Sequence, residues 1–492
     1  MNEATTFSAA ETAAAPSLSA APAGDPSRWT SKRRDFLRML GYGAGAATLG
    51  PLLGACGSSG AQTHAEALRE QLMADEGFWT GVQNMFVLNP QKTFMNIGTG
   101  GSMPSMVLDV FAAENRTKAV ESGSGYGNLL DLRRQVAPGF GVDADELAFS
   151  ANTSSGMCHA ILGIDWQRGD VVVPTNHEHG GGDTPLKIAT DRYGIEVSRI
   201  PMPVGNNQTA ATYVNLFDER IRALKAQGKR VRAMMWSSPT YKTGTMLPIA
   251  DLMAVVKTHE LISIVDGAHL PGMMAYNYAE LGMDFMSGAG HKWQCGPGST
   301  GILVVRNKIR ASNPLPLPKW YPIHSSSYTA LDRTTNGVET YDIAASITSC
   351  GSLHTPMFMA LAQACKQWDS IGRKKIETYD LTLSSYLKEK IAERWGIDAL
   401  YSPKDDPKLL SALTSFNPFP VKTDVMNAQK ASAFVSRMLS EYPQGFVIRS
   451  ADFPVIGAAS NHYGIRISTH LWHDARDIDL LVDAMWDLSR KI

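Results

Sequence analysis

The chain has 492 residues, 44% of them hydrophobic and 8% aromatic, so it can bury a large core and form two domains. Its 46 basic and 47 acidic side chains give a formal net charge of -1, which excludes a strong global attraction to nucleic acid or to an anionic surface. The five cysteines show no paired metal-ligand spacing and are too few for a disulfide scaffold. We therefore expect a globular protein that binds a small molecule, with no metal and no nucleic acid.

The first 60 residues carry the features of an export signal. The pair Arg33 and Arg34 lies in a basic segment at 32–38, and an uncharged Gly/Ala-rich run follows at 39–53. That run is short for a bilayer span, so we interpret the segment as a signal for the twin-arginine export machinery. A basic disordered tail is the alternative interpretation.

Cys56 comes at the end of this apolar run, in Leu53-Gly54-Ala55-Cys56, and a flexible Gly/Ser tether follows at 57–60. The pattern resembles a bacterial lipobox, which implies that Cys56 is diacylated; a stray cysteine near a cleavage site is the alternative. We therefore predict a protein on the periplasmic side of a bacterial cell envelope, attached to the membrane through this lipid anchor alone.

Downstream of the tether, the apolar periodicity predicts a helix over residues 61–89, and strand-like and helical segments alternate from residue 94. Short apolar runs predict strands at 146–150, 170–175, 231–236, 263–265, 284–286 and 301–305, with amphipathic helices between them, for example at 216–226 and 249–259. This alternation predicts an α/β fold with a mostly parallel sheet, whose ligand site lies at the carboxyl ends of the strands.

The pattern changes at about residue 341 to long helices with two late strand-like runs, at 445–449 and 464–468. We expect these residues to form a smaller C-terminal α+β domain. The predicted division is therefore a leader and tether over 1–60, an N-terminal helix with the large domain over 61–340, and the small domain over 341–492.

Lys292 lies in a Gly-rich segment that follows one of the predicted strands. The glycines allow the backbone to approach a ligand closely. A lysine held among apolar and cationic neighbours has a lowered pKa, which its amine needs in order to form a Schiff base. The alternative is a surface lysine in a loop.

Asp266 ends another predicted strand, and His269 follows three residues later. A buried carboxylate needs a partner, and the protonated nitrogen of a pyridoxal phosphate (PLP) ring would supply one. An Asp before a Gly is also common as a turn residue or a helix cap, so this position alone leaves both interpretations open.

Two further strand ends carry polar residues. Thr153 and Ser154 begin a helix, where amides, hydroxyls and the helix dipole bind phosphate, although an ordinary helix cap explains the same residues. His179 lies in Asn176-His177-Glu178-His179, where an imidazole could lie flat over a planar cofactor. Metal binding is the other interpretation of these histidines, and no third ligand with suitable spacing supports it.

In their order and spacing, these segments resemble the class V aminotransferase family from about residue 94 to the C-terminus. The segment 94–104 is similar to the family's entry motif, and Arg466-Ile467-Ser468-Thr469-His470 is similar to its Arg-x-Ser-x-His run. The segment His291-Lys292-Trp293, with the Gly-Pro that follows, is nearest to the isopenicillin N epimerase-like branch.

This resemblance implies a homodimeric PLP enzyme of fold type I that acts on an amino acid or a small peptide. It also implies a role for each matching residue. Lys292 would hold PLP as a Schiff base, and Asp266 would pair with the ring nitrogen. His269 would face the ring hydroxyl, His179 would stack on the ring, and the phosphate would be held by Thr153, Ser154 and His291. Arg466 would bind the substrate α-carboxylate, with Asn96 in the substrate site.

Four positions depart from the family's pattern. Ala289 replaces a phosphate-binding Ser, and Val338 replaces a Thr that reaches the phosphate of the neighbouring subunit. Tyr241 and His473 stand where many relatives have Asn. We therefore expect the substrate side of the site to be particular to this chain.

Three reactions are open to such a site, namely epimerisation, transamination and elimination of a β-substituent. The resemblance to the epimerase-like branch favours epimerisation. Cysteine desulfurase activity needs a mobile thiolate shortly before the carboxylate-binding arginine, and residues 446–466 contain no cysteine. A binding lipoprotein that keeps the fold without turnover is the alternative from another class, and the intact set Lys292, Asp266, His179 and Arg466 argues against it.

Overall fold

The computed structural model of the protein describes residues 62–125, 129–326, 342–419 and 427–492. The predicted export signal, the lipobox cysteine Cys56 and Val338 lie outside these ranges. Within them, no helix has the length and apolar character that a membrane crossing requires.

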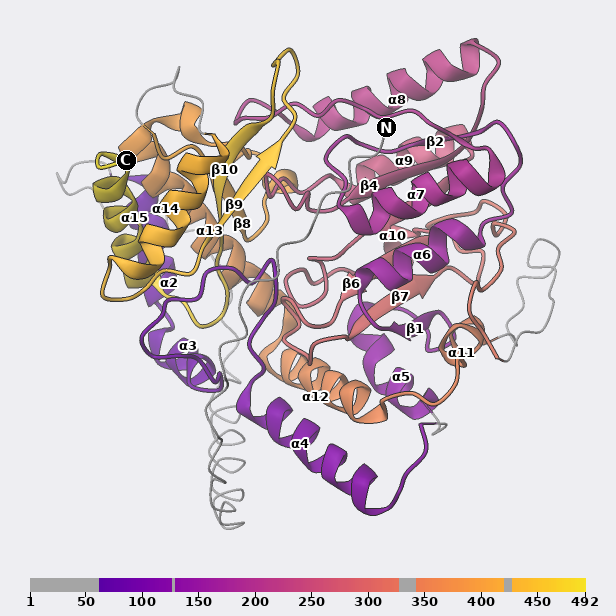
Figure 1. Cartoon of the computed structure of the whole chain (residues 1–492), viewed down its shortest axis with the longest axis horizontal. Helices are drawn as coiled ribbons and strands as arrows, with labels where there is room; N and C mark the ends of the chain where they lie inside the picture. The colour runs from indigo at the N-terminus through magenta and orange to yellow at the C-terminus, as the bar shows by residue number, and fades with distance from the viewer. Residues whose placement is uncertain (1–61, 126–128, 327–341, 420–426) are drawn as a thin grey trace, which may run out of the picture. The chain divides into compact units, whose positions relative to one another are not determined.

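A seven-stranded sheet forms the centre of the larger part of the fold (Figure 1). Its strands are β1 (Leu147–Ser150), β2 (Asp170–Val173), β3 (Glu196–Val197), β4 (Arg230–Ser237), β5 (Ile262–Asp266), β6 (Phe285–Ala289) and β7 (Gly301–Val305). They lie in the order β1-β7-β6-β5-β4-β2-β3, and of these seven only β7 runs opposite to the other six. The predicted mostly parallel α/β sheet is confirmed.

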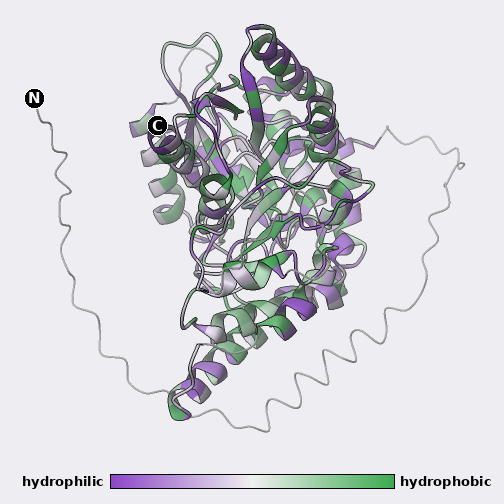
Figure 2. Ribbon diagram, turned by 90° about the vertical axis from the view of Figure 1, so that its right-hand side faces the viewer, coloured by the Kyte–Doolittle hydropathy of each residue, from purple (hydrophilic) through white to green (hydrophobic). Residues whose placement is uncertain are grey.

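Helices cover both faces of this sheet, which is why strands such as β5 are apolar and fully buried along their length. Ile264 and Val265 belong to separate apolar clusters, because successive side chains of a strand point to opposite faces. One face packs against α6 (Thr153–Gly163), α7 (Gly180–Tyr193) and α11 (Ile343–Thr348), and the other against α8 (Ala210–Ala226), α9 (Ile249–His259) and α12 (Thr355–Ile371). Figure 2 shows the hydrophobic colouring concentrated in the inner strands.

A second, three-stranded antiparallel sheet has the order β8-β10-β9. It is formed by β8 (Leu413–Phe416), β9 (Arg449–Phe453) and β10 (His462–Ser468). The helices around it are α2 (His64–Met73), α13 (Arg373–Trp395), α14 (Ala428–Ser440) and α15 (Ala475–Ser489). The other helices are α3 (Glu76–Gln83), α4 (Ser105–Val120), α5 (Leu130–Val136) and α10 (Tyr278–Leu281), with 3-10 turns at Ala137–Phe140, Ile397–Ala399 and Pro407–Leu409.

The single helix predicted over residues 61–89 is wrong, because α2 and α3 are separate. Asp75 leaves the helical conformation, with φ -127° and ψ 37°, and becomes the residue before the first turn of α3. Asp is favoured at this position because its side chain competes with the helical backbone. The helix therefore restarts at Glu76.

The strand predicted at 445–449 is displaced toward the C-terminus, because β9 begins at Arg449. Val447 instead pairs with the N-terminal segment: its amide donates to the Thr93 carbonyl, and its carbonyl accepts from the Met95 amide. Long-range pairing of this kind cannot be inferred from local apolar pattern.

Contacts cross the division predicted at residue 340. Helix α12 packs against α4 and α5, α11 packs against β1, and α2 packs against α13 and α15. The N-terminal helix α2 thus lies among the C-terminal helices (Figure 1). The boundaries at 60 and 340 stay predictions.

Candidate active site

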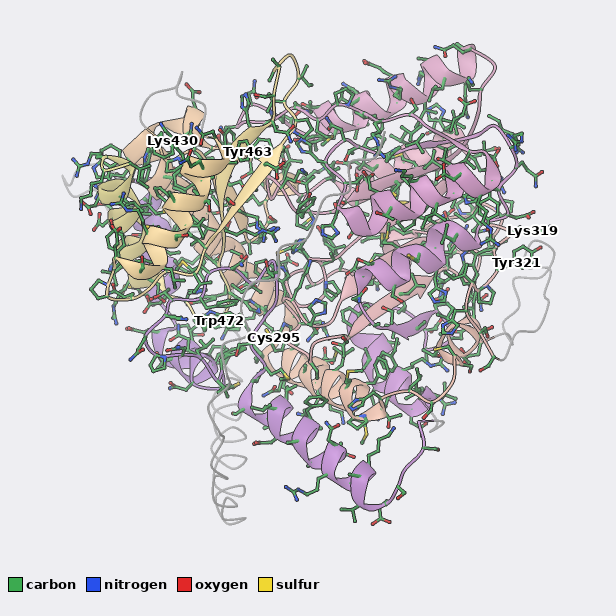
Figure 3. The ribbon with its side chains drawn as sticks, in the orientation of Figure 1. Cys295, Lys319, Tyr321, Lys430, Tyr463 and Trp472 are labelled. Atoms are coloured by element: carbon green, nitrogen blue, oxygen red, sulfur yellow. The ribbon has the colours of Figure 1, made fainter. Side chains whose placement is uncertain are left out.

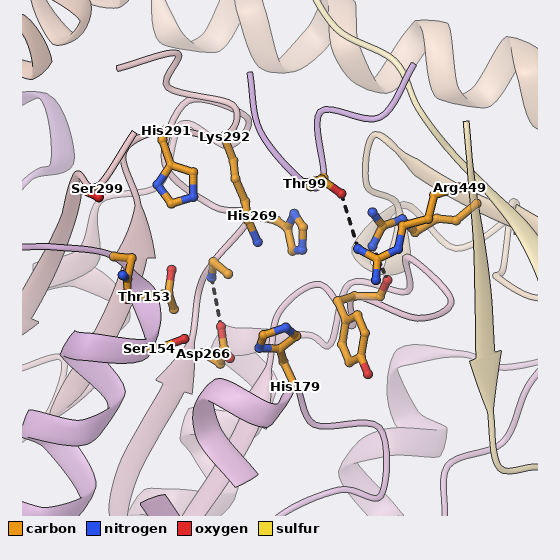
Figure 4. A pocket seen from close by; sticks show the side chains of 15 residues that line it. Thr99, Thr153, Ser154, His179, Asp266, His269, His291, Lys292, Ser299 and Arg449 are labelled. Carbon is orange, nitrogen blue, oxygen red and sulfur yellow. Dashed lines mark hydrogen bonds between the residues drawn. The ribbon is translucent and has the colours of Figure 1, made fainter. Parts of the chain in front are cut away.

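A cavity of about 410 Å³ opens beyond the carboxyl ends of β1, β5 and β6 (Figure 4). This is the location that a mostly parallel sheet favours for a ligand. The cavity is lined by Gly98, Thr99, Asn152, Thr153, Ser154, His179, Tyr241, Asp266, Ala268, His269, His291, Lys292, Ser299, Arg449 and Arg466. All the predicted cofactor-binding residues are therefore in one place, together with Arg466.

Lys292 lies on the turn that follows β6, and its side chain extends into the cavity (Figure 4). Its Nζ has no hydrogen bond or ion pair with the residues that the structure describes. Burial lowers the pKa of this amine from 10.5 to about 8, against the opposing effect of Asp266. About a tenth of the amine is thus neutral at pH 7, the form that a nucleophile or a general base requires.

Asp266 is the last residue of β5 and is 3% exposed. Its Oδ1 accepts a hydrogen bond from the Ala268 amide at 3.1 Å. Burial raises the pKa of this carboxyl, while the charge of Lys292 opposes the rise. A carboxylate held so deep in the cavity would be stabilised by a cationic ligand atom.

His269 presents a free N–H group to the cavity. Its Nδ1 accepts a hydrogen bond from the Trp293 indole at 3.1 Å, and burial lowers its pKa well below the usual value, so the ring is neutral with its proton on Nε2. This buried Nε2 has no partner among the described residues. A donor in this position needs an acceptor from a ligand.

His179 precedes the first turn of α7, where its Nδ1 accepts from the Gly181 amide at 3.0 Å. Burial lowers its pKa, so this ring too is neutral and keeps its proton on Nε2. Tyr241 contacts it edge-on, with ring centroids 4.9 Å apart. Lys292 and His179 extend into the cavity from opposite sides, which leaves the space between them for a flat ligand (Figure 4).

Thr153, Ser154, His291 and Ser299 form one end of the cavity (Figure 4). Thr153 and Ser154 are the first residues of α6, and the buried Thr153 hydroxyl has no partner within the described ranges. Free hydroxyls at a helix N-terminus suit a phosphate. His291 donates from Nδ1 to the Thr300 carbonyl at 3.0 Å, so it could donate to a phosphate only through a protonated Nε2.

Arg466 lies at the other end of the cavity on β10 and is 2% exposed. Its guanidinium donates to the Tyr241 carbonyl at 2.8 Å and to Asn96 Oδ1 at 3.1 Å, and its Nε has no partner among the described residues. Asn96 does not line the cavity; it orients Arg466. Burial and the nearby charge of Arg449 lower the pKa of Arg466 to about 9.

Sequence reasoning missed Arg449, Thr99 and Ser299 as cavity residues. The sequence predicts Arg449 only as the end of a strand. The pairing of β9 with β10 brings it beside Arg466, and this pairing cannot be inferred from the local sequence. Of the departures from the family's pattern, Tyr241 lines the cavity, whereas Ala289 and His473 are buried outside it.

These groups fit PLP by their chemistry. Two buried donors have no partner among the described residues: Thr153 Oγ1 suits the phosphate of PLP, and His269 Nε2 suits its ring oxygen. The buried Asp266 suits a protonated ring nitrogen. The amine of Lys292 lies between these groups and suits the cofactor's aldehyde. The described residues contain no cluster of three or more metal-ligating side chains, and no cysteine lines the cavity within those residues.

The chain is similar to isopenicillin N epimerase from Streptomyces clavuligerus, with 22% identity over 424 residues that cover 83% of this chain and 97% of the relative. It is also similar to a probable cysteine desulfurase from Methanothermobacter thermautotrophicus, with 23% identity and coverage of 73% and 84%, respectively.

Solved structures of low identity share the fold. The apo structure of cysteine desulfurase from Thermococcus onnurineus NA1 has a TM-score of 0.64 at 17% identity, covering 84% of this chain and 98% of that one. The cystine C-S lyase C-DES, solved with its product cysteine persulfide, has a TM-score of 0.62 at 21% identity, with coverage of 80% and 97%. The family model described as aminotransferase class-V matches residues 109–481. The chain therefore belongs to the aminotransferase class-V family and is a PLP-dependent enzyme of fold type I.

Proposed function

We propose that this enzyme exchanges the proton on the α-carbon of an amino acid or small peptide, in the manner of an epimerase. The observation that carries the proposal is the presence of Lys292, the carboxylate of Asp266 and the guanidinium of Arg466 in one cavity, where both charges act on the pKa of the Lys292 amine. When bound, PLP supplies an electron sink for the negative charge that develops at the α-carbon.

Lys292 is the residue to which we assign cofactor attachment and movement of the α-proton. Its pKa of about 8 suits a general base near neutral pH. Arg466 orients the substrate by binding its α-carboxylate through two parallel hydrogen bonds, and Asn96 fixes that guanidinium. Asp266 would keep the cofactor's ring nitrogen protonated.

Histidine, threonine and serine side chains would hold the rest of the cofactor. His269 would donate from Nε2 to the ring oxygen, and Thr153 and Ser154 would donate to the phosphate, with His291 joining them when protonated. His179 would lie against the ring on the side away from Lys292.

Two observations support epimerisation over the other reactions. Inversion needs a proton donor on the face opposite the base, and His179 lies on the side opposite Lys292, where the imidazolium form of its ring would supply that proton. The chain is also similar to the isopenicillin N epimerase from Streptomyces clavuligerus over 97% of that protein's length.

Elimination of a β-substituent is the second candidate, and the similarity to cysteine desulfurases supports it. It starts with removal of the same α-proton by Lys292, and a leaving group then departs from the substrate β-carbon. The two reactions are therefore distinguished by their products rather than by their first step.

The test is a screen of L- and D-amino acids for exchange of the α-hydrogen in D2O, followed by NMR. We expect exchange with inversion, and we expect Lys292→Ala to lower the exchange rate by about 100- to 10,000-fold, because the general base is lost. Lys292→Ala should also lose the cofactor's borohydride-fixable attachment. The control is Lys187→Ala, which removes an exposed lysine of α7 that does not line the cavity.

Borohydride fixation of the cofactor to the Lys292→Ala variant would remove Lys292 from the proposed role. Release of pyruvate or of another elimination product, without inversion, would move the assignment to the lyase.

We further propose that the mature enzyme is a homodimer in a bacterial envelope, exported folded and anchored through Cys56. The paired Arg33 and Arg34 and the lipobox-like sequence before Cys56 support the location. The family resemblance supports the dimer.

A further inference from the structure

A second arginine, Arg449, faces Arg466 directly across the three-stranded sheet. The two residues are register partners in the antiparallel pair of β9 and β10. Like charges placed directly opposite each other on neighbouring strands are destabilising. A pair of this kind therefore needs a compensating anion to be favourable.

The described part of the chain provides no such anion. Neither arginine forms an ion pair with a described carboxylate: Arg466 donates to the Tyr241 carbonyl and the Asn96 amide oxygen, and Arg449 donates to the Thr99 hydroxyl at 3.3 Å. These acceptors are all neutral. Among the described residues, Asp266 is the one carboxylate that lines the cavity, and the side chains that shift its pKa are Lys292 and His179.

The arginine pair is separate from the phosphate end of the cavity. Figure 4 shows Arg449 and Thr99 on one side, with Lys292 and Asp266 between them and the group Thr153, Ser154 and Ser299. A cofactor phosphate bound by the hydroxyls therefore leaves both guanidinium groups free for the substrate.

The two arginines also differ in depth. Arg466 is buried and Arg449 is exposed at the rim of the same cavity. Two cations at different depths match an anionic molecule with charges at both ends better than they match a single carboxylate.

We propose that the substrate carries two anionic groups, its α-carboxylate on Arg466 and a second carboxylate on Arg449. The substrate class is thus an acidic amino acid or a small peptide with a second carboxylate. The inference rests on the proposed function, because that function assigns the α-carboxylate to Arg466.

The experiment measures dissociation constants by calorimetry on the PLP-loaded enzyme, with succinate and glutarate as dicarboxylates and butyrate and valerate as monocarboxylates. These compounds lack an amine and do not turn over. We expect the dicarboxylates to bind about tenfold more tightly, since a charge-assisted contact at an exposed arginine is partly screened by solvent.

Arg449→Gln should remove this preference while changing monocarboxylate affinity by less than about twofold, and Arg449→Lys should keep part of the preference because it keeps the charge. The matched control is Arg192→Gln, an exposed arginine of α7 that does not line the cavity. It should bind both classes as the unmodified enzyme does. Arg466→Gln should weaken the binding of both classes.

Equal affinity for the two classes in the unmodified enzyme overturns the inference. So does an Arg449→Gln variant that loses monocarboxylate and dicarboxylate affinity equally, because Arg449 would then act on the α-carboxylate itself. Failure of the proposed function gives a different result: an Arg466→Gln variant that retains monocarboxylate binding, or a cofactor that borohydride does not fix to Lys292.

Discussion

Single hydrogen bonds determine how the histidines of the site can act. His179 and His269 each accept a hydrogen bond at Nδ1, from the Gly181 amide and the Trp293 indole respectively. Each neutral ring therefore keeps its proton on Nε2. His291 has the opposite arrangement, because its Nδ1 donates to the Thr300 carbonyl. The residue type alone does not distinguish these cases, although their chemical consequences differ.

Most residues of the site could be predicted from the sequence because each follows a short apolar strand. Asp266 ends β5, Lys292 and Thr153 follow shortly after β6 and β1, and the carboxyl ends of these strands meet at one edge. Arg449 could not be predicted in this way, because it enters the site through pairing with Arg466 on a distant strand. Asn96 was placed in the substrate site and instead supports Arg466.

The lowered pKa of Lys292 can be measured in the cofactor-free enzyme. Burial destabilises the ammonium form, so the pKa falls from 10.5 to about 8. We predict that the rate of reductive methylation at Lys292, followed by mass spectrometry, rises with pH to a midpoint of about 8 and then levels off. A midpoint near 10.4, the value of a lysine in solution, would show that the Lys292 amine is not buried as the structure has it.

At the level of elements, the strands with continuous apolar runs could be predicted and the polar ones could not. β5 and β7 are buried on both faces and are read easily from the sequence. β8, with the sequence Leu413-Thr414-Ser415-Phe416, is equally buried but contains two hydroxyl residues. Its polar groups are satisfied by tertiary contacts such as the Ser415 hydroxyl to the Lys242 carbonyl, which only the folded chain provides.

The pairing of β9 with β10 carries a stability cost that can be tested. Arg449→Gln removes the repulsion between the facing guanidinium groups, and we predict a rise of about 0.2–1 kcal/mol in the free energy of unfolding without ligand. Denaturant unfolding of the purified enzyme measures this change, with Arg192→Gln as the control that should have no effect. A variant that is more stable and has lost dicarboxylate affinity would show that Arg449 serves substrate binding at the expense of stability. Lower stability would mean that the Thr99 contact of Arg449 outweighs the repulsion.

A buried ion pair joins helix α13 to the turn that carries Lys292. His470 donates from Nδ1 to Asp380 at 2.9 Å and from Nε2 to the Trp293 carbonyl at 2.9 Å, and both side chains of the pair are fully buried. The imidazole therefore holds helix α13 and the Lys292 turn together through both of its nitrogens, and burial raises the pKa of the Asp380 carboxyl. Cys295 lies 3.5 Å from the same ring, and Figure 3 shows it near Trp472 in the interior.

We predict that His470→Ala lowers the free energy of unfolding by about 3–5 kcal/mol, because it leaves the Asp380 carboxylate buried without a partner. Denaturant unfolding checks this value. The control is the double variant His470→Gln with Asp380→Asn, which removes both titratable groups and should cost less than His470→Ala. If the double variant is the less stable of the two, the charges of this pair are not coupled.

On the scale of the whole molecule, the active site depends on both sheets. Lys292 and Asp266 come from the seven-stranded sheet, whereas Arg466 and Arg449 come from the three-stranded one. The segment 95–101 contacts both, since the Met95 carbonyl accepts from the Ser468 amide of β10 and the Gly101 amide donates to the His291 carbonyl after β6. A chain that is not fully folded therefore cannot assemble the cofactor groups and the substrate groups together.

This dependence on the complete fold leads to the prediction on export. A cofactor site that forms only in the folded chain favours loading before export, and the twin-arginine machinery is the route that carries folded proteins. We predict that Arg33→Lys together with Arg34→Lys traps folded, PLP-loaded precursor in the cytoplasm, measured by fractionation and by the visible absorbance of the cofactor. The control is Arg38→Lys, which makes the same conservative change outside the pair and should leave export intact.

Anchoring is tested in the same fractionation. Cys56→Ala removes the thiol that would be diacylated, so we expect the exported enzyme to leave the membrane fraction while keeping its cofactor. Retention of this variant on the membrane would show that attachment does not depend on Cys56. Continued export in cells that lack the twin-arginine translocase would contradict the assigned route, because the enzyme would then cross the membrane unfolded and acquire PLP afterwards.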